Sequence, residues 1–126
     1  MSSLTEHALE GIRILVVEDN LALATSLCWA LESLGATVVG PARSCEEALQ
    51  SLQEHTIDVA ILDSDLRGVP STPVAMALQE AQKPIVVLTG FETSDALPAQ
   101  LRGLPCLRKP VDPFDLAEHL LQAMAD

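Results

Sequence analysis

Aromatic side chains are nearly absent from this chain of 126 residues, which has one tryptophan, two phenylalanines and no tyrosine. Hydrophobic residues still make up 48% of it, enough to favour folding over disorder. A chain of this length suits one domain that buries roughly two-thirds of its unfolded surface. We therefore expect a single domain with an aliphatic core.

Basic residues are also scarce, because seven lysines and arginines stand against eighteen acidic residues, for a formal net charge of −11. Nucleic-acid binding normally needs a basic surface, so the composition argues against a nucleic-acid partner. Acidity of this kind gives solubility. It also allows some of the carboxylates to form a metal site.

The three cysteines, Cys28, Cys45 and Cys106, are too few and too scattered for a disulfide framework or a zinc site. An odd number without a CxxC pair fits a reducing compartment, so we expect a cytoplasmic protein. No apolar run reaches 18 residues and the N-terminus lacks a signal-peptide pattern, so no membrane partner is expected. Residues 1–10 are predicted to be a flexible leader and residues 11–126 the domain.

Apolar runs alternate with helix-like stretches. The predicted strands are residues 12–17, 38–39 (ended by Gly40-Pro41), 59–62, 85–88 and 104–107. Continuous apolar strands indicate a parallel sheet covered on both faces, and the alternation predicts a doubly wound α/β fold. No GxGxxG motif follows the first strand, which argues against a dinucleotide site.

Capping residues predict where the intervening helices begin. Asn20 suits the N-cap of the first helix, and Ser44 opens a capping box for the second. Pro73 and Pro113 suit the first turns of the third and last helices. The helix between the fourth and fifth strands, at about 94–102, is expected to be short because Pro98 interrupts it.

Polar residues follow four of the strands. Glu18 and Asp19 follow the first strand, Asp63 the third, Thr89 the fourth and Lys109 the fifth. Sites in open α/β sheets lie at the carboxyl ends of the strands, so these five side chains are expected to meet at one edge.

Such a cluster needs positive charge, because carboxylates about 4 Å apart repel by roughly 4 kcal/mol at an effective dielectric near 20. Lys109 supplies one positive charge, and a hard divalent cation such as Mg²⁺, which binds carboxylates, waters and phosphate oxygens, supplies two. Phosphoryl transfer depends mainly on positioning and charge neutralisation, and an aspartate nucleophile forms an aspartyl phosphate. The cluster therefore points to phosphoryl chemistry.

These motifs, taken in order, resemble the bacterial response-regulator receiver family. The matching stretches are 14–20 (ILVVEDN), 61–63 (ILD), 88–90 (LTG) and 108–110 (RKP). The resemblance implies a five-stranded sheet of flavodoxin-like order 2-1-3-4-5 with helices on both faces. It implies a stand-alone receiver, not an enzyme beyond its own phosphorylation and dephosphorylation. The phosphodonor would be a histidine kinase or histidine phosphotransfer protein, and output would be through contacts with an unknown protein.

The resemblance also implies how the acidic residues divide their roles. Asp63 would be the phosphoacceptor. Asp19 would bind Mg²⁺ (or Mn²⁺) directly, and Glu18 directly or through water. Asp63 and the backbone carbonyl of Asp65 would complete the protein ligands.

The remaining roles concern the phosphoryl group and the switch. Lys109 would pair with the acceptor carboxylate and then with the phosphoryl group, while Thr89 would move to bond it. The Lys109–Pro110 peptide would be cis. Typical receivers carry Tyr or Phe three residues before this lysine, where the chain has Cys106. It is more similar to an atypical subfamily with a Phe-Ala-Thr-Gly-apolar-Tyr motif, matched in part by residues 87–92, and to receivers of alphaproteobacterial general-stress and sensor-kinase systems.

Apolar residues outside the cluster suggest two further hypotheses. Phe91 would shield the acyl phosphate from water, or alternatively cap the core. Leu21, Cys28 and Trp29 lie off the inward stripe of the first helix and would form a docking patch for the phosphodonor. The alternative is that Trp29 packs on its own helix and neighbours.

Two alternative functions stay open. Asp63-Ser64-Asp65 after an apolar strand resembles the DxD opening of aspartate-based phosphatases of the haloacid dehalogenase type, but Arg67 stands where those enzymes carry Thr or Val. The second alternative is a degenerate receiver that binds partners without phosphorylation, an idea that Cys106 favours and the acidic cluster opposes.

Overall fold

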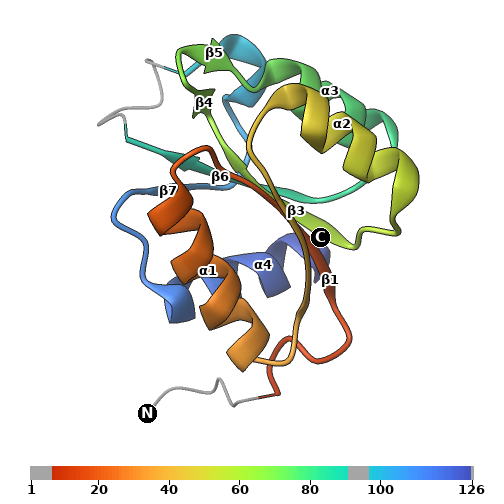
Figure 1. Ribbon diagram of the computed structural model, residues 1–126, viewed down its shortest axis with the longest axis vertical. Helices are drawn as coiled ribbons and strands as arrows, with labels where there is room; N and C mark the ends of the chain where they lie inside the picture. The colour runs from red at the N-terminus through yellow and green to blue at the C-terminus, as the bar shows by residue number, and fades with distance from the viewer. Residues whose placement is uncertain (1–6, 91–96, 126) are drawn as a thin grey trace.

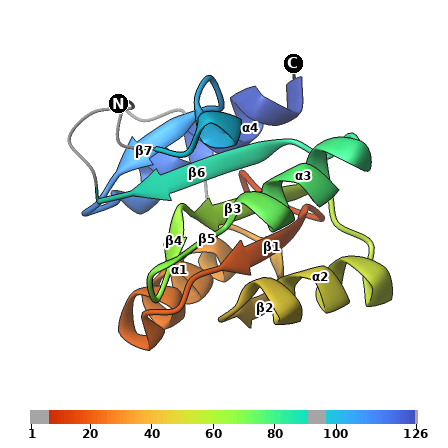
Figure 2. The same cartoon turned by 90° about the horizontal axis from the view of Figure 1, so that it is seen from above.

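The computed structural model describes residues 7–90 and 97–125. Its main sheet has five parallel strands in the order β2-β1-β3-β6-β7, which confirms the predicted flavodoxin-like order (Figures 1 and 2). The strands are β1 (Arg13–Val17), β2 (Thr37–Ala42), β3 (Val59–Asp63), β6 (Ile85–Thr89) and β7 (Cys106–Arg108). A short antiparallel hairpin, β4 (Asp65–Leu66) and β5 (Val69–Pro70), lies at the edge toward which these strands point (Figure 2).

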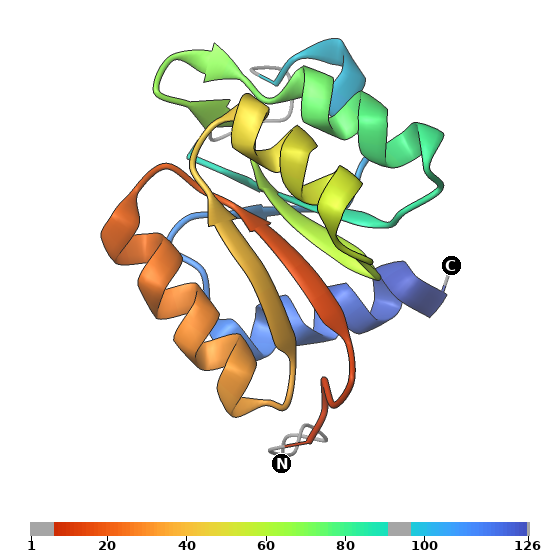
Figure 3. The same cartoon turned by 45° about the vertical axis from the view of Figure 1, so that its right-hand side comes forward.

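Helices cover both faces of the sheet, as predicted. They are α1 (Leu21–Ser33), α2 (Cys45–Glu54), α3 (Thr72–Glu80), a 3₁₀ turn η2 (Ala99–Leu101) and α4 (Pro113–Ala125). The first and last lie on one face, and α2 and α3 on the other (Figure 3). Alternate residues of each central strand enter opposite cores: Ile14 and Val16 pack with α1 and α4, whereas Leu15 and Val17 pack with α2 and α3.

The predicted helix starts follow from local hydrogen bonds. Asn20 Oδ1 accepts the N–H of Leu23 at 3.1 Å, and Ser44 Oγ accepts the N–H of Glu47 at 3.1 Å. Each bond satisfies a donor that the first turn of a helix leaves unpaired. In the segment before β7, the described helical structure is only the single turn η2, and residues 94–96 of the helix predicted at about 94–102 lie outside the described residues.

The second strand is longer than predicted, because it does not end at Gly40-Pro41 but continues to Ala42. Its pairing with β1 shifts register between Leu15 and Val17. As a result, Gly40 and Pro41 together lie opposite the single residue Val16. Gly40 has a φ of +106°, and a Cβ there would lie 2.8 Å from the backbone oxygen of Val16. Only glycine allows this close approach, so the dipeptide that was expected to end the strand instead bends it.

Leu9 extends the packed domain into the segment predicted to be a flexible leader. Its side chain is fully buried in the core beneath α1 and α4, and its N–H donates to Leu34 O at 2.9 Å. The boundary predicted after residue 10 therefore moves to the N-terminal side of Leu9.

Leu9→Ala is expected to lower the free energy of unfolding by about 2–5 kcal/mol, because it leaves a cavity in this core. Urea denaturation would measure the loss. Leu21→Ala, at a position 57% exposed, is the matched control and should change stability by only about 0.5 kcal/mol. Equal effects for the two variants would mean that residue 9 does not pack as described.

Candidate functional site

Three carboxylates meet at the carboxyl edge of the sheet. Glu18 follows β1, and Asp63 ends β3; because Val17 pairs with Leu62, the residues that follow lie side by side. One carboxylate oxygen from each of Glu18, Asp19 and Asp63 lies within 4.8 Å of the others. Glu18 and Asp63 are buried, and Asp19 is partly exposed. Such a group of oxygens is suited to a hard divalent cation.

Lys109 bridges two of these carboxylates from the end of β7. Its Nζ donates to Asp63 Oδ2 at 2.9 Å and lies 3.0 Å from Glu18 Oε1, an ion pair without hydrogen-bond geometry. The backbone N–H of Lys109 donates to Thr89 O at 2.8 Å, which ties the lysine to β6. The Lys109–Pro110 peptide bond is cis. One ammonium thus faces two buried carboxylates, so the site is short of positive charge.

This shortage changes two pKa values. Burial, with a contribution from Asp63, raises the pKa of Glu18 from 4.5 to about 7. Burial alone would lower the pKa of Lys109, but its hydrogen bond to Asp63 and its charge interactions with Asp63 and Glu18 outweigh that effect and raise it. Glu18 Oε1 is also a buried oxygen with no hydrogen-bond partner among the described residues. Either a proton or a metal ion bound to Glu18 would offset the cost of this buried negative charge.

The raised pKa of Glu18 predicts how stability depends on pH. A carboxyl whose folded pKa lies above its unfolded value stabilises the fold fully below about pH 4.5 and loses that contribution as the pH rises through about 7. In a chelator, the unfolding free energy of the wild type should therefore fall relative to Glu18→Gln by up to about 3 kcal/mol over this range. Urea titrations at several pH values would measure it, and parallel profiles would contradict the raised pKa.

Thr89 lies beside Asp63, as the strand order predicts. Asp63 pairs with Leu88 across β3 and β6, so Thr89 is one residue beyond, and it is 4% exposed. Asp65 behaves differently from the clustered acids: its carboxylate turns to accept the N–H of Gly68 at 3.2 Å, while its own N–H donates to Asp63 Oδ1 at 3.1 Å. Asp65 therefore contacts Asp63 through its backbone N–H, while its carboxylate binds within the hairpin.

The other predicted residues lie elsewhere. Leu21 and Trp29 are 57% and 74% exposed on α1, away from the carboxylates. Trp29 borders an apolar cavity of about 230 Å³ that Phe114 of α4 also lines. Phe91 lies outside the described residues.

Arg67 also lines the site, although no sequence motif assigned it there. It lies in the turn of the β4–β5 hairpin, and its Nε is 3.9 Å from Asp19 Oδ2. The one available signal was the Arg67-Gly68 dipeptide, because glycine between short extended segments is typical of a hairpin. The paired segments are only two residues each, too short to be recognised from periodicity.

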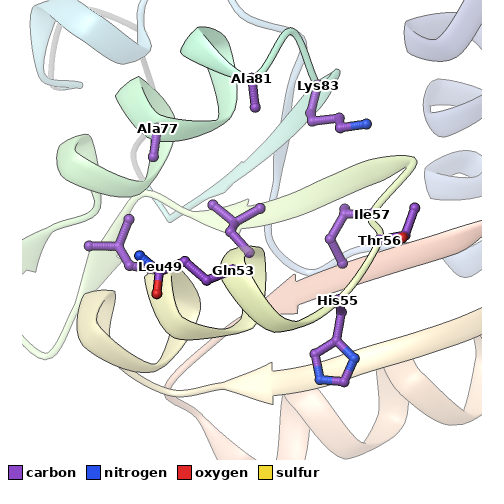
Figure 4. A pocket seen from close by; sticks show the side chains of 9 residues that line it. Leu49, Gln53, His55, Thr56, Ile57, Ala77, Ala81 and Lys83 are labelled. Atoms are coloured by element: carbon purple, nitrogen blue, oxygen red, sulfur yellow. The ribbon is translucent and has the colours of Figure 1, made fainter.

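A cavity of about 340 Å³ opens over the cluster. It is lined by Glu18, Asp19, Asn20, Asp63, Ser64, Asp65, Arg67, Gly90 and Lys109. A larger cavity of about 480 Å³ lies between α2 and α3, where aliphatic side chains predominate and Lys83 is near the rim (Figure 4). The smaller cavity is the functional candidate, because it alone of the two gathers carboxylates and cations.

Comparisons with known proteins agree with this geometry. The response regulator receiver domain family matches residues 14–121. The virulence sensor protein BvgS of Bordetella pertussis is 30% identical over 91% of the chain, which spans only 10% of that protein's length. The solution structure of SdrG from Sphingomonas melonis Fr1 is 38% identical, with a TM-score of 0.78 over 94% of this chain and 98% of that one.

A third relative shares the fold. The receiver domain of the sensor histidine kinase PA1611 from Pseudomonas aeruginosa, solved with a magnesium ion coordinated in its active-site cleft, has a TM-score of 0.80 at 24% identity over 92% of this chain and 99% of that one. No helix in the described ranges has the length and hydrophobicity needed to span a membrane. The family match covers most of the chain, including all four clustered residues Glu18, Asp19, Asp63 and Lys109, and so the chain belongs to the response regulator receiver domain family of two-component signalling.

Proposed function

We propose that the chain accepts a phosphoryl group on Asp63, in a reaction that depends on Mg²⁺ (or Mn²⁺), and signals through protein–protein contacts. The observation that carries the proposal is the environment of Asp63. Its carboxylate lies at the floor of an open cavity, 2.9 Å from Lys109 Nζ, with oxygens of Glu18 and Asp19 within 4.8 Å. A nucleophilic carboxylate, a metal-binding group and a fixed cation are the parts that phosphoryl transfer needs.

The donor set fits the metal that the family implies. Glu18 and Asp19 with Asp63 would hold Mg²⁺, and the backbone carbonyl of Asp65 would add a fourth protein oxygen. When bound, Mg²⁺ neutralises part of the charge that develops on the phosphoryl oxygens. The position of Glu18 Oε1 supports this assignment: it is buried without a hydrogen bond and shares the Lys109 ammonium with Asp63, so one positive charge serves two buried carboxylates.

The transfer itself needs little from the acceptor. A carboxylate oxygen of Asp63 forms a bond to phosphorus while the bond from phosphorus to the donor nitrogen of a phosphohistidine breaks, and the electron pair stays on that nitrogen. A carboxylate nucleophile has no proton to lose in this step, and the Lys109 ammonium lies 2.9 Å from it. The Lys109 ammonium then shifts its hydrogen bond from the carboxylate to a phosphoryl oxygen, and the Thr89 hydroxyl bonds another.

Two features would modify the signal. Cys106, exposed on β7 and paired with Val87, stands where typical receivers have the switch aromatic, so Thr89 would act without that partner. Phe91, two residues beyond Thr89, would shield the acyl phosphate from water.

The proposed compartment is the cytoplasm, where the reducing environment suits the three free cysteines.

The direct test is incubation with Mg²⁺ and acetyl phosphate followed by intact-mass measurement. The wild type should gain about 80 Da, the mass of one phosphoryl group, and should gain nothing when a chelator replaces Mg²⁺. A degenerate receiver would show no gain in either condition. A gain that persists in the chelator would contradict the metal dependence.

The exposed face of α1 is the proposed docking surface for a protein phosphodonor, a histidine kinase or a histidine phosphotransfer protein. Leu21 and Trp29 lie there, 57% and 74% exposed. Trp29→Ala should slow transfer from such a donor by about tenfold, because exposed tryptophans dominate interface energies. The rate with acetyl phosphate is the internal control and should not change; an unchanged rate with the protein donor would remove Trp29 from the interface.

A further inference from the structure

The β4–β5 hairpin lies at the edge toward which the sheet strands point (Figure 2), and its Arg67 brings an additional cation to the mouth of the site. Leu66 pairs with Val69, so Arg67 and Gly68 are the two central residues of a tight turn. Both have positive φ, 55° for Arg67 and 83° for Gly68. Asparagine, aspartate and glycine adopt this conformation readily, whereas arginine does so at a cost. Turn formation therefore does not explain an arginine at this position.

The contacts of Arg67 suggest a different reason for its presence. Its side chain lines the same cavity as the three carboxylates, with Nε 3.9 Å from Asp19 Oδ2. Lys109 is held by Glu18 and Asp63. The two cations thus divide the three carboxylates between them, and Arg67 faces Asp19, the carboxylate that Lys109 does not contact at ion-pair distance.

The Arg67–Asp19 pair is weak enough to exchange partners. The contact is long, and the Arg67 side chain is 67% exposed, so solvent and salt screen it. When Asp19 binds a metal ion, the guanidinium loses this partner while remaining at the mouth of the cavity. A guanidinium presents a planar fork of donors that matches phosphate oxygens. Because the chain carries a net charge of −11, an anionic donor is repelled overall and depends on such a local cation.

We propose that Arg67 is a positioning residue with two alternative partners. In the metal-free protein it pairs with Asp19. Once Asp19 is a metal ligand, Arg67 binds the phosphoryl oxygens of the incoming phosphodonor and holds them over Asp63. This inference rests on the proposed function, and it adds to the carboxylate cluster a donor-binding residue supplied by the hairpin.

The test compares four variants by two measurements. Arg67→Gln removes the charge, Arg67→Asn removes it with a residue that tolerates positive φ, and Arg67→Lys keeps the charge without the fork. Arg13→Gln makes the same charge change at the start of β1, the opposite edge of the sheet. Calorimetry without donor gives the Mg²⁺ affinity, and the phosphorylation rate as a function of acetyl phosphate concentration gives KM and the maximal rate.

Arg67→Gln and Arg67→Asn should bind Mg²⁺ about two- to fivefold more tightly, because Asp19 no longer has a competing partner. Both should raise the KM for acetyl phosphate by about fivefold or more while the maximal rate changes less than about twofold. Arg67→Lys should recover part of the KM, and Arg13→Gln should behave as the wild type.

Several results would overturn the inference. Unchanged KM in Arg67→Gln and Arg67→Asn, with a phosphorylated wild type, would refute it and leave the proposed function standing. Equal shifts in Arg13→Gln would assign the effect to net charge and refute it too. A wild type that gains no phosphoryl group would instead refute the proposed function, and this inference with it.

Discussion

Asp63→Asn is expected to abolish the gain of about 80 Da that the wild type shows with Mg²⁺ and acetyl phosphate. The amide keeps the shape of the side chain but is a poor nucleophile, and no other described carboxylate can replace it. Glu18 is fully buried with a pKa raised to about 7, so near neutral pH it is partly protonated in the metal-free protein. Asp19 is oriented toward Arg67. We therefore expect a loss of at least about a hundredfold in rate.

The matched control for this prediction is Asp65→Asn. Its carboxylate accepts the N–H of Gly68, a role that the asparagine oxygen can keep, and its side chain is not part of the three-carboxylate cluster. Asp65→Asn should still be phosphorylated. Phosphorylation of Asp63→Asn at the wild-type rate would show that Asp63 is not the acceptor.

Asp19→Asn is expected to have the second largest effect, weakening Mg²⁺ binding by at least about tenfold. The variant removes one of three anionic ligands, and the most exposed of the three, so it should lower affinity without creating a buried unpaired group. Because it also removes repulsion from the metal-free cluster, the stability in chelator should stay the same or rise. Measuring the stability in chelator therefore separates a loss of Mg²⁺ binding from misfolding of the variant.

Calorimetric titration with MgCl₂ measures this affinity. Asp58→Asn, at the opposite edge of the sheet where Asp58 accepts the N–H of Arg13, is the control and should bind Mg²⁺ as the wild type does. Affinity that stays unchanged in Asp19→Asn would place the metal elsewhere, and the account of the carboxylate cluster would then be wrong.

The sequence allowed the convergence of the cluster to be predicted because parallel strands all end at one edge. Glu18, Asp63 and Thr89 each follow a buried apolar run and Lys109 follows β7, so the parallel arrangement of the strands brings them together. The caps Asn20 and Ser44 were predictable for a related reason, since each makes its bond within three residues along the chain.

The features that escaped prediction depend on contacts between distant segments. Leu9 is buried because Leu34 and the helices above it provide a core, although it lies in a short segment with no apolar periodicity of its own. Gly40-Pro41 has the composition of a strand end, but pairing with β1 carries the strand through it. Arg67 reaches Asp19 through a two-residue turn with positive φ, and the two-residue strands that flank this turn are too short to be recognised from the sequence.

The family match also settles one alternative. The Asp63-Ser64-Asp65 motif that suggested a haloacid dehalogenase phosphatase lies on the third strand, in a chain whose residues 14–121 match the receiver family. The second acid of the motif caps the hairpin turn through Gly68. The family match therefore favours the proposed phosphorylation of Asp63 over turnover of a phosphate ester.

The most direct measurement identifies which residue carries the phosphoryl group. Wild-type protein treated with Mg²⁺ and acetyl phosphate can be reduced with borohydride, which converts an acyl phosphate to an alcohol, and then digested and sequenced by tandem mass spectrometry. Conversion at the residue after Leu62, seen only when divalent metal is present, is the predicted outcome. Conversion at any other acid, or an equal yield in chelator, would contradict the claim that Glu18, Asp19 and Lys109 together make Asp63 a phosphoryl acceptor.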